Sequence, residues 1–181
     1  YNGSFPGPTI IALPGDRVCI RVINNLPEKT SVHWHGLEVP NKMYGVPPIE
    51  PSPFIYPGEY FDYEFTIKNP PVTYMYHSHV NVAVQDNAGL FGGLIIEDPK
   101  YCNKKHYKDY LILLQEWAVN SLPWGDIDSG TYNLTFKMPE FNFFTMNGKC
   151  YPSTEPLHVS YGDKVKIRFG NIQMHHHPIH L

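Results

Sequence analysis

Several short segments of the chain alternate apolar and polar residues, which is typical of strands with one buried face. In residues 16–24, for example, Val18, Ile20 and Val22 fall on the same side of an extended chain. Further runs of this kind span residues 60–68, 72–77, 91–97, 110–117, 131–138 and 164–169. Proline and glycine pairs separate the runs, and no long stretch shows the ~3.6-residue period of a surface helix. The pattern predicts an all-β chain folded as a Greek-key sandwich or barrel.

Composition narrows the functional classes. The 181 residues allow one domain or two small ones, and 42% apolar residues suffice to bury a core. A formal net charge of -3 does not favour a basic surface for nucleic acid. No apolar run reaches the ~18–20 residues that a membrane-spanning helix needs. We therefore expect neither nucleic-acid binding nor a membrane span.

The chain contains an internal repeat. Residues 15–21 (GDRVCIR) are echoed by residues 162–168 (GDKVKIR), and an Asn follows each copy at the same offset. A histidine then stands nine residues after each Asn. The repeat predicts two homologous β-domains, one spanning residues 1–99 and one spanning residues 100–181. The second is expected to hold only the N-terminal part of its unit.

Histidines carry the strongest chemical signal. Eight of the ten fall into three groups, HWHG at residues 33–36, HSH at residues 77–79 and HHHPIH at residues 175–180. In a strand, residues i and i+2 share a face, so each H-x-H motif aims two imidazoles the same way. Neutral imidazole suits copper, zinc, iron or nickel. Two such pairs, with a third group at the repeat-equivalent position, predict a metal centre.

Two other metal folds fit less well. A zinc hydrolase needs three protein ligands and often a carboxylate, and Glu38 lies at no obvious spacing for that role. The cupin pattern fails because no glycine stands at the required place before the first H-x-H pair.

Several motifs occur in an order that resembles the multicopper oxidases (laccases, ferroxidases and bilirubin oxidases). They are HWHG at 33–36, GVP at 45–47, YHSH at 76–79, GLFG at 89–92 and HPIHL at 177–181. The resemblance implies an all-β fold of cupredoxin-like Greek-key β-sandwich domains, one complete and one partial. The family has four H-x-H motifs, of which this chain holds two and the beginning of a third.

The resemblance also implies a ligand set and a reaction. It makes His33 and His180 ligands of a type 2 copper, His35, His77 and His79 ligands of a binuclear type 3 pair, and His177 a ligand of a type 1 blue copper. The type 2 and type 3 coppers form a trinuclear cluster that reduces O2 to water with four electrons. A small phenol, amine or metal ion donates electrons one at a time through the type 1 site.

Departures from the family pattern refine this expectation. Ser78 stands where a type 1 Cys would be, so the first domain carries no blue copper. The spacing of 98 residues from His79 to His177 leaves no room for a third, middle domain. The two-domain class is therefore favoured, in which clusters form between the subunits of a homotrimer. Family members are usually exported, so a secreted, periplasmic or otherwise extracytoplasmic location is expected.

Other candidate residues have two interpretations. Asp86 lies near the position of a laccase acid that relays protons to reduced oxygen, and it equally suits a turn before Asn87. Cys102 and Cys150 flank one stretch of chain and are candidates for a disulfide. Cys19 alternates with apolar neighbours and is expected to be a buried thiol.

Two rival functions remain open at this stage. A copper nitrite reductase is also a two-domain cupredoxin trimer, but it needs a single type 2 copper at each interface, which leaves the second pair, His77 and His79, unexplained. A non-enzymatic cupredoxin-like copper-binding module would have lost part of the ligand set. A His-Cys-His motif later in the sequence would favour the oxidase over the module.

Overall fold

The computed structural model describes residues 1–47, 51–101, 107–119 and 141–180. Its strands are β1 (Gly7–Ala12), β2 (Arg17–Ile23), β3 (His33–His35), β4 (Tyr60–Thr66), β5 (Thr73–His77), β6 (Phe91–Ile96), β7 (Tyr107–Trp117), β8 (Phe143–Met146) and β9 (Lys164–Asn171). Its helices are the single turns η1 (Asn41–Met43) and α1 (Val82–Gln85). The predicted all-β class is confirmed. No helix of the described residues is long and apolar enough to cross a membrane.

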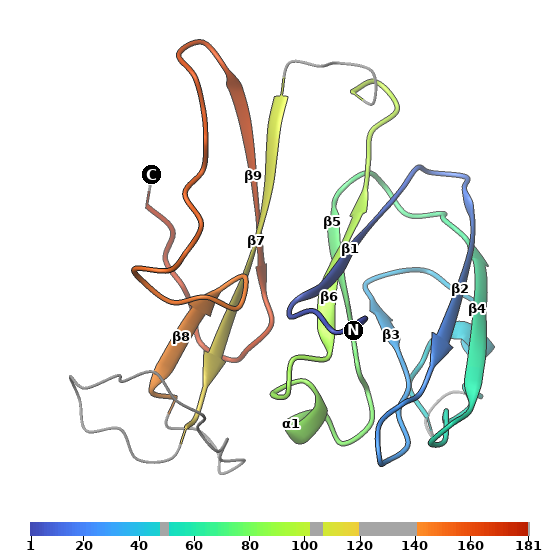
Figure 1. Cartoon of the computed structure of the whole chain (residues 1–181). Coiled ribbons are helices and arrows are strands. Elements are labelled where there is room, and N and C mark those ends of the chain that lie inside the picture. The colour runs from blue at the N-terminus through green and yellow to red at the C-terminus, as the bar shows by residue number, and fades with distance from the viewer. Residues whose placement is uncertain (48–50, 102–106, 120–140, 181) are drawn as a thin grey trace.

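The strands form three sheets in two halves, which lie side by side in Figure 1. In the N-terminal half, a four-stranded sheet with the order β1-β6-β5-β3 lies beside the antiparallel pair β2-β4. In the C-terminal half, β7 is the central strand of the sheet β8-β7-β9 and runs parallel to β9. The β1–β6 pairing is parallel, whereas β3–β5 and β5–β6 are antiparallel.

The core of the N-terminal half is built from large aromatic side chains. Trp34 and Tyr63 are 1% and 0% exposed, and their ring centroids lie 5.3 Å apart in an edge-on arrangement. Phe65 and Tyr76 also pack against Trp34. The Tyr63 hydroxyl accepts a hydrogen bond of 2.9 Å from the backbone N–H of Val32, next to the first histidine pair. The aromatic core therefore also fixes the segment that leads into β3.

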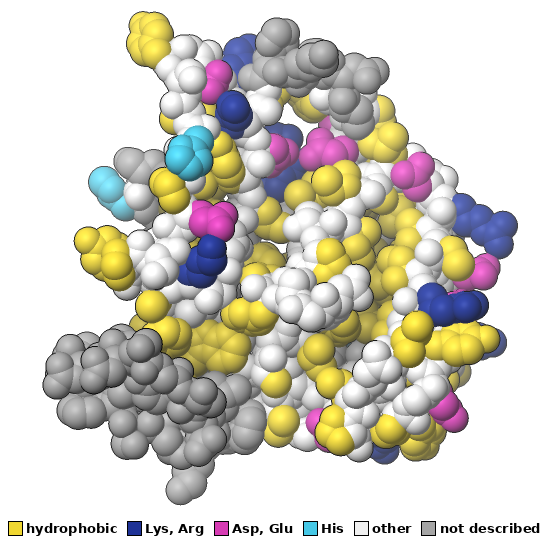
Figure 2. Space-filling view, viewed as in Figure 1, with side chains coloured by type: hydrophobic (Ala, Val, Ile, Leu, Met, Phe, Trp, Pro, Cys, Tyr) yellow, Lys and Arg dark blue, Asp and Glu magenta, His cyan; other side chains and the backbone are white. Residues whose placement is uncertain are grey.

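The expectation for Cys19 is wrong. The apolar side chains of β2 face the core, so Cys19 lies on the opposite, exposed face of the strand. Arg17 and Arg21 share that face, where Arg21 forms a two-bond contact with Asp62 of β4. Basic and acidic side chains are interspersed in this way on the face that Figure 2 shows. The expected Cys102–Cys150 pairing involves a residue outside the described ranges.

Glycines allow the two halves to approach closely. A side chain at Gly93 of β6 would overlap Leu111 of β7, and one at Gly170 of β9 would press on the Met75 sulfur of β5. Arg168 of β9 adds a polar bridge across the same boundary, because its guanidinium contacts Glu97 and Thr73 in the N-terminal half and Asp109 in β7. Since Arg168 is largely buried and contacts both halves, it resists their separation.

Replacing Tyr63 by Phe should destabilise the protein by about 1–3 kcal/mol, because the buried Val32 N–H would lose its acceptor. Urea unfolding measures the change. Tyr74→Phe is the matched control, since the Tyr74 hydroxyl bonds to the Pro70 carbonyl at an exposed site. Its loss should stay within about 0.5 kcal/mol. Equal losses in the two variants would contradict this account of the core.

Gly45→Ala should cost about 3 kcal/mol or more, because its methyl group would collide with the Val32 carbonyl while the residue keeps φ at +77°. Gly58→Ala is the control, with φ at +81° and open space around the added methyl. Its cost should be the backbone strain alone, about 1–2 kcal/mol. Thermal unfolding of both variants tests the difference, and identical melting temperatures would show that the collision is unimportant.

Candidate metal centre

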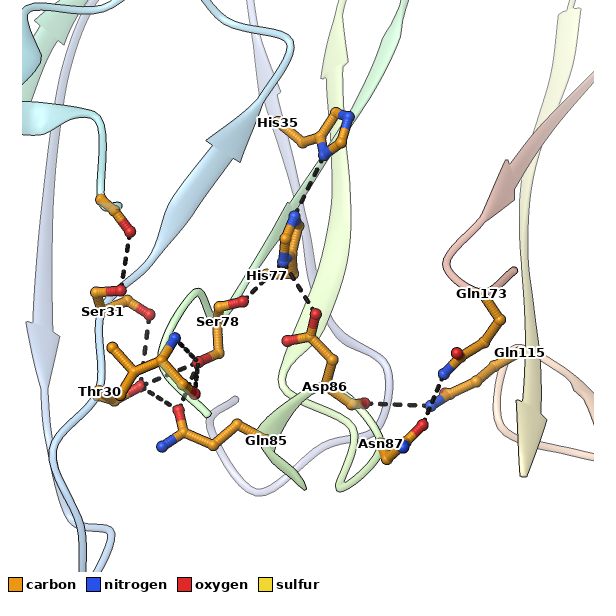
Figure 3. A network of polar contacts seen from close by, with 12 residues as sticks. Thr30, Ser31, His35, His77, Ser78, Gln85, Asp86, Asn87, Gln115 and Gln173 are labelled. Atoms are coloured by element: carbon orange, nitrogen blue, oxygen red, sulfur yellow. Dashed lines mark hydrogen bonds and ion pairs between the residues drawn. The ribbon is translucent and has the colours of Figure 1, made fainter. Parts of the chain in front are cut away.

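The two H-x-H pairs are brought together by the pairing of β3 with β5. In this antiparallel ladder His33 lies directly opposite His77, and His35 lies opposite Met75. Side chains alternate along a strand, so His33 and His35 leave the sheet on the same face while Trp34 enters the core on the other. His77 joins them on the histidine face, and Figure 3 shows its ring turned toward His35.

The imidazoles converge at distances that suit a metal centre. The Nδ1 atom of His35 lies 3.3 Å from Nε2 of His77, and one ring nitrogen each from His33, His35 and His77 lies within 4.8 Å of the others. The ring of His79 completes the cluster, with its centroid 5.4 Å from that of His33 and 6.0 Å from that of His77. We call His33, His35, His77 and His79 the four-histidine cluster. An all-imidazole donor set of this kind fits copper.

His33 is held in the form that binds a metal. Its Nδ1 atom lies 2.9 Å from the carbonyl oxygen of Tyr44, which leaves Nε2 directed into the cluster. Burial lowers the pKa of His33 to about 4. Burial, followed by the nearby His77 and His79, also lowers the pKa of His35. Both rings are therefore neutral at pH 7, and a neutral ring has the lone pair that coordination requires.

His77 is oriented by an acid. Its Nδ1 atom lies 3.0 Å from Oδ2 of Asp86 and 2.7 Å from the carbonyl oxygen of Ser78, so Nε2 is the atom that faces His35. Burial opposes a charge on His77, but the hydrogen bond and charge of Asp86 outweigh it and raise its pKa. Burial raises the pKa of Asp86 as well, despite its contact with His77. The structure thus places Asp86 beside the cluster, through His77.

The third histidine group lies elsewhere. His177 and His180 belong to the C-terminal segment, which runs along β7 and β9 on the side of the molecule away from β3 (Figure 1). There the fully buried Glu116 of β7 contacts two histidines, with its carboxylate oxygens 3.0 Å from Nδ1 of His175 and 2.9 Å from Nε2 of His177. The sequence analysis missed Glu116. The available signal was a single acid within the apolar run of residues 110–117.

Comparison with known proteins identifies a family and several relatives of this chain. The family model for multicopper oxidases matches residues 1–101. The multicopper oxidase MmcO of Mycobacterium tuberculosis is 29% identical over 94% of this chain and 38% of its own length. Laccase-1 of Cryptococcus neoformans var. grubii is 30% identical over 96% of this chain and 31% of its own length.

Solved structures extend the comparison to the fold. The blue copper oxidase from Nitrosomonas europaea is 32% identical, with a TM-score of 0.76 over 94% of this chain and 53% of that chain. A multicopper oxidase called mgLAC is also 32% identical, with a TM-score of 0.74 over 93% and 52%. The cupredoxin fold expected from the resemblance is thereby confirmed. The chain spans about a third of the length of the two curated relatives and about half of these solved chains. It belongs to the multicopper oxidase family.

Proposed function

We propose that this chain forms part of a copper-dependent oxidoreductase that couples one-electron oxidation of a small substrate to four-electron reduction of O2 to water. The observation that carries the proposal is the four-histidine cluster, in which two H-x-H pairs share one open centre. A phenol, an amine or a metal ion is the proposed electron donor. Copper, when bound, supplies the one-electron redox chemistry and the site of O2 reduction.

Within this cluster we assign His33 to the type 2 copper and His35, His77 and His79 to the type 3 pair. The neutral state of His33 and His35 supports their role as ligands. The convergence of four rings does not favour the nitrite reductase alternative, which needs one copper at each interface. His180 is assigned to the type 2 copper and His177 to the type 1 copper.

Asp86 has two roles in this proposal. Its carboxylate holds a proton on Nδ1 of His77, which keeps Nε2 available to a metal. Burial raises the pKa of this carboxylate, so it can also take up a proton and pass it on close to the place where oxygen is reduced. The second role makes Asp86 the proposed proton relay.

The placement of the third histidine group supports a homotrimer. The resemblance assigns His180 and His33 to the same copper, but the C-terminal end of the chain lies beside β7 and β9, well away from β3 (Figure 1). A neighbouring subunit can supply His180 to a cluster that His33 begins. We accordingly propose that trinuclear clusters form between subunits. Each subunit contains a first domain at residues 1–99 and a second domain whose N-terminal part is residues 100–181. An extracytoplasmic location is part of the same proposal.

In the full-length protein, His35→Ala and His79→Ala should abolish O2 reduction and leave the blue absorption band at about 600 nm intact. The reason is that type 3 ligands are distinct from the thiolate site that gives the colour. An oxygen electrode and a visible spectrum measure the two properties. Loss of the blue band in the His79→Ala protein would overturn the ligand assignment.

The 181-residue chain alone, supplied with copper, should catalyse no O2 consumption beyond that of free copper. Its described cysteines, Cys19 and Cys150, stand in no His-Cys-His motif, and neither does Cys102, so electrons have no thiolate–copper entry site. Copper binding to the four-histidine cluster should persist at reduced affinity. The test measures O2 consumption after ascorbate is added to the copper-loaded chain. The control is ascorbate with free copper at the same copper concentration. O2 consumption above that of free copper would contradict it.

A further inference from the structure

His79 differs from the other three members of the cluster in how it is held. His33 and His35 lie in β3 and His77 lies in β5, so the β3–β5 ladder fixes their backbone. Strand β5 ends at His77, and His79 therefore stands beyond the last ladder bond. Something other than the sheet must fix the backbone that carries its ring.

Ser78, which lies between His77 and His79, makes the first of the contacts that fix this part of the backbone. Ser78 is fully buried, and its backbone N–H donates to the carbonyl of Leu90 at 2.9 Å. Its hydroxyl lies 3.3 Å from the N–H of Val80 and donates to Oε1 of Gln85 at 2.5 Å. The hydroxyl of Ser78 thus spans His79 and ties the backbone on its far side to Gln85.

Gln85 is a buried amide with all four of its hydrogen-bonding positions filled. It is 2% exposed, and its Oε1 also accepts a bond of 2.8 Å from the hydroxyl of Thr30. Its Nε2 donates to the carboxylate of Glu28 at 3.0 Å and to the carbonyl of Lys29 at 2.9 Å. A side chain satisfied on every side has one orientation, because any rotation would leave buried polar groups unpaired.

The side chain of Gln85 is hydrogen-bonded to both of the segments that carry a histidine pair (Figure 3). Thr30 lies three residues before His33, and Ser78 lies between His77 and His79. The main chain of Gln85 is itself anchored, since its N–H donates to the Asn81 carbonyl at 2.9 Å and its carbonyl accepts from Leu90. Gln85 therefore cross-links the segment entering β3 to the segment leaving β5.

We propose that Gln85 is a positioning residue for His79. Its amide holds the Ser78 hydroxyl against the segment that precedes β3, and so keeps the ring of His79 turned toward His33. The inference rests on the proposed function, because it concerns the geometry of the same copper cluster. It predicts a selective effect, in which loss of the Gln85 amide releases His79 and leaves the three ladder-held histidines in place.

The test uses Gln85→Leu in the full-length protein, which keeps the volume and removes all four bonds. Crystal structures of the metal-free protein should show the His79 ring displaced or in several rotamers, with His33, His35 and His77 unmoved. Titration with Cu(II) should show the affinity of the cluster falling by about 10–100-fold, as for other supports of metal ligands.

Gln115→Leu is the matched control. Gln115 is as deeply buried as Gln85, at 1% exposed, and it bonds to the backbone carbonyl of Asp86 without touching Ser78. It should leave the His79 ring and the cluster affinity for Cu(II) near the wild-type values. If Gln85→Leu fails to fold, Ser78→Ala is the alternative variant. It deletes only the hydroxyl oxygen that bonds to Gln85, and it should release His79 in the same way.

The outcomes separate the two proposals. An ordered, unmoved His79 ring in both Gln85→Leu and Ser78→Ala, with wild-type affinity for Cu(II), would overturn the role of Gln85. Equal displacement of all four rings would also overturn it, because the effect would then be general loosening. A wild-type protein that binds no Cu(II) would instead refute the proposed function, while the order of the His79 ring would still decide the role of Gln85.

Discussion

The register of β3 against β5 is the constraint on which both the core and the candidate metal centre depend. It places His33 opposite His77 on one face of the sheet and Trp34 opposite Tyr76. A slip by one residue would turn every side chain of the shifted strand to the other face. Trp34 would then leave the core and the imidazoles would enter it. The three residues of β3 thus couple the packing of the hydrophobic core to the positions of the histidine side chains, and a change of register would disrupt both.

The alternation in the sequence predicted β2, β4, β5, β6, β7 and β9, but it did not predict β1 or β8. The predicted run at residues 131–138 lies outside the described residues. The expected strand face is shared by His33 and His35 in β3, whereas β5 ends at His77, before His79. The alternation could not predict that the two pairs meet, because the register between strands 42 residues apart depends on tertiary packing. The resemblance supplied that expectation, and the roles of the individual histidines remain predictions. The alternation was misread at Cys19, since Val18, Ile20 and Val22 already occupy the inner face of β2.

Some contacts at the site have no local signal in the sequence. Glu116 meets His177 from a strand 61 residues earlier in the chain, and Gln85 meets Thr30 across 55 residues. Such contacts follow from how the segments pack, and buried polar side chains at these places are recognised only once their partners are known. The boundary between the two proposed domains is likewise a prediction from the repeat. Gly93, Gly170 and Arg168 show that the two halves it separates are packed tightly together.

The most direct test of the account is anomalous diffraction at the copper edge from crystals of the full-length protein loaded with copper. The account predicts three copper peaks at the four-histidine cluster, with ring nitrogens of His33, His35, His77 and His79 at about 2.0–2.1 Å from them. It also predicts that His180 of a neighbouring subunit reaches the copper bound by His33. A cluster without copper, or with a single ion that leaves His35 and His77 in mutual contact, would contradict the central claim.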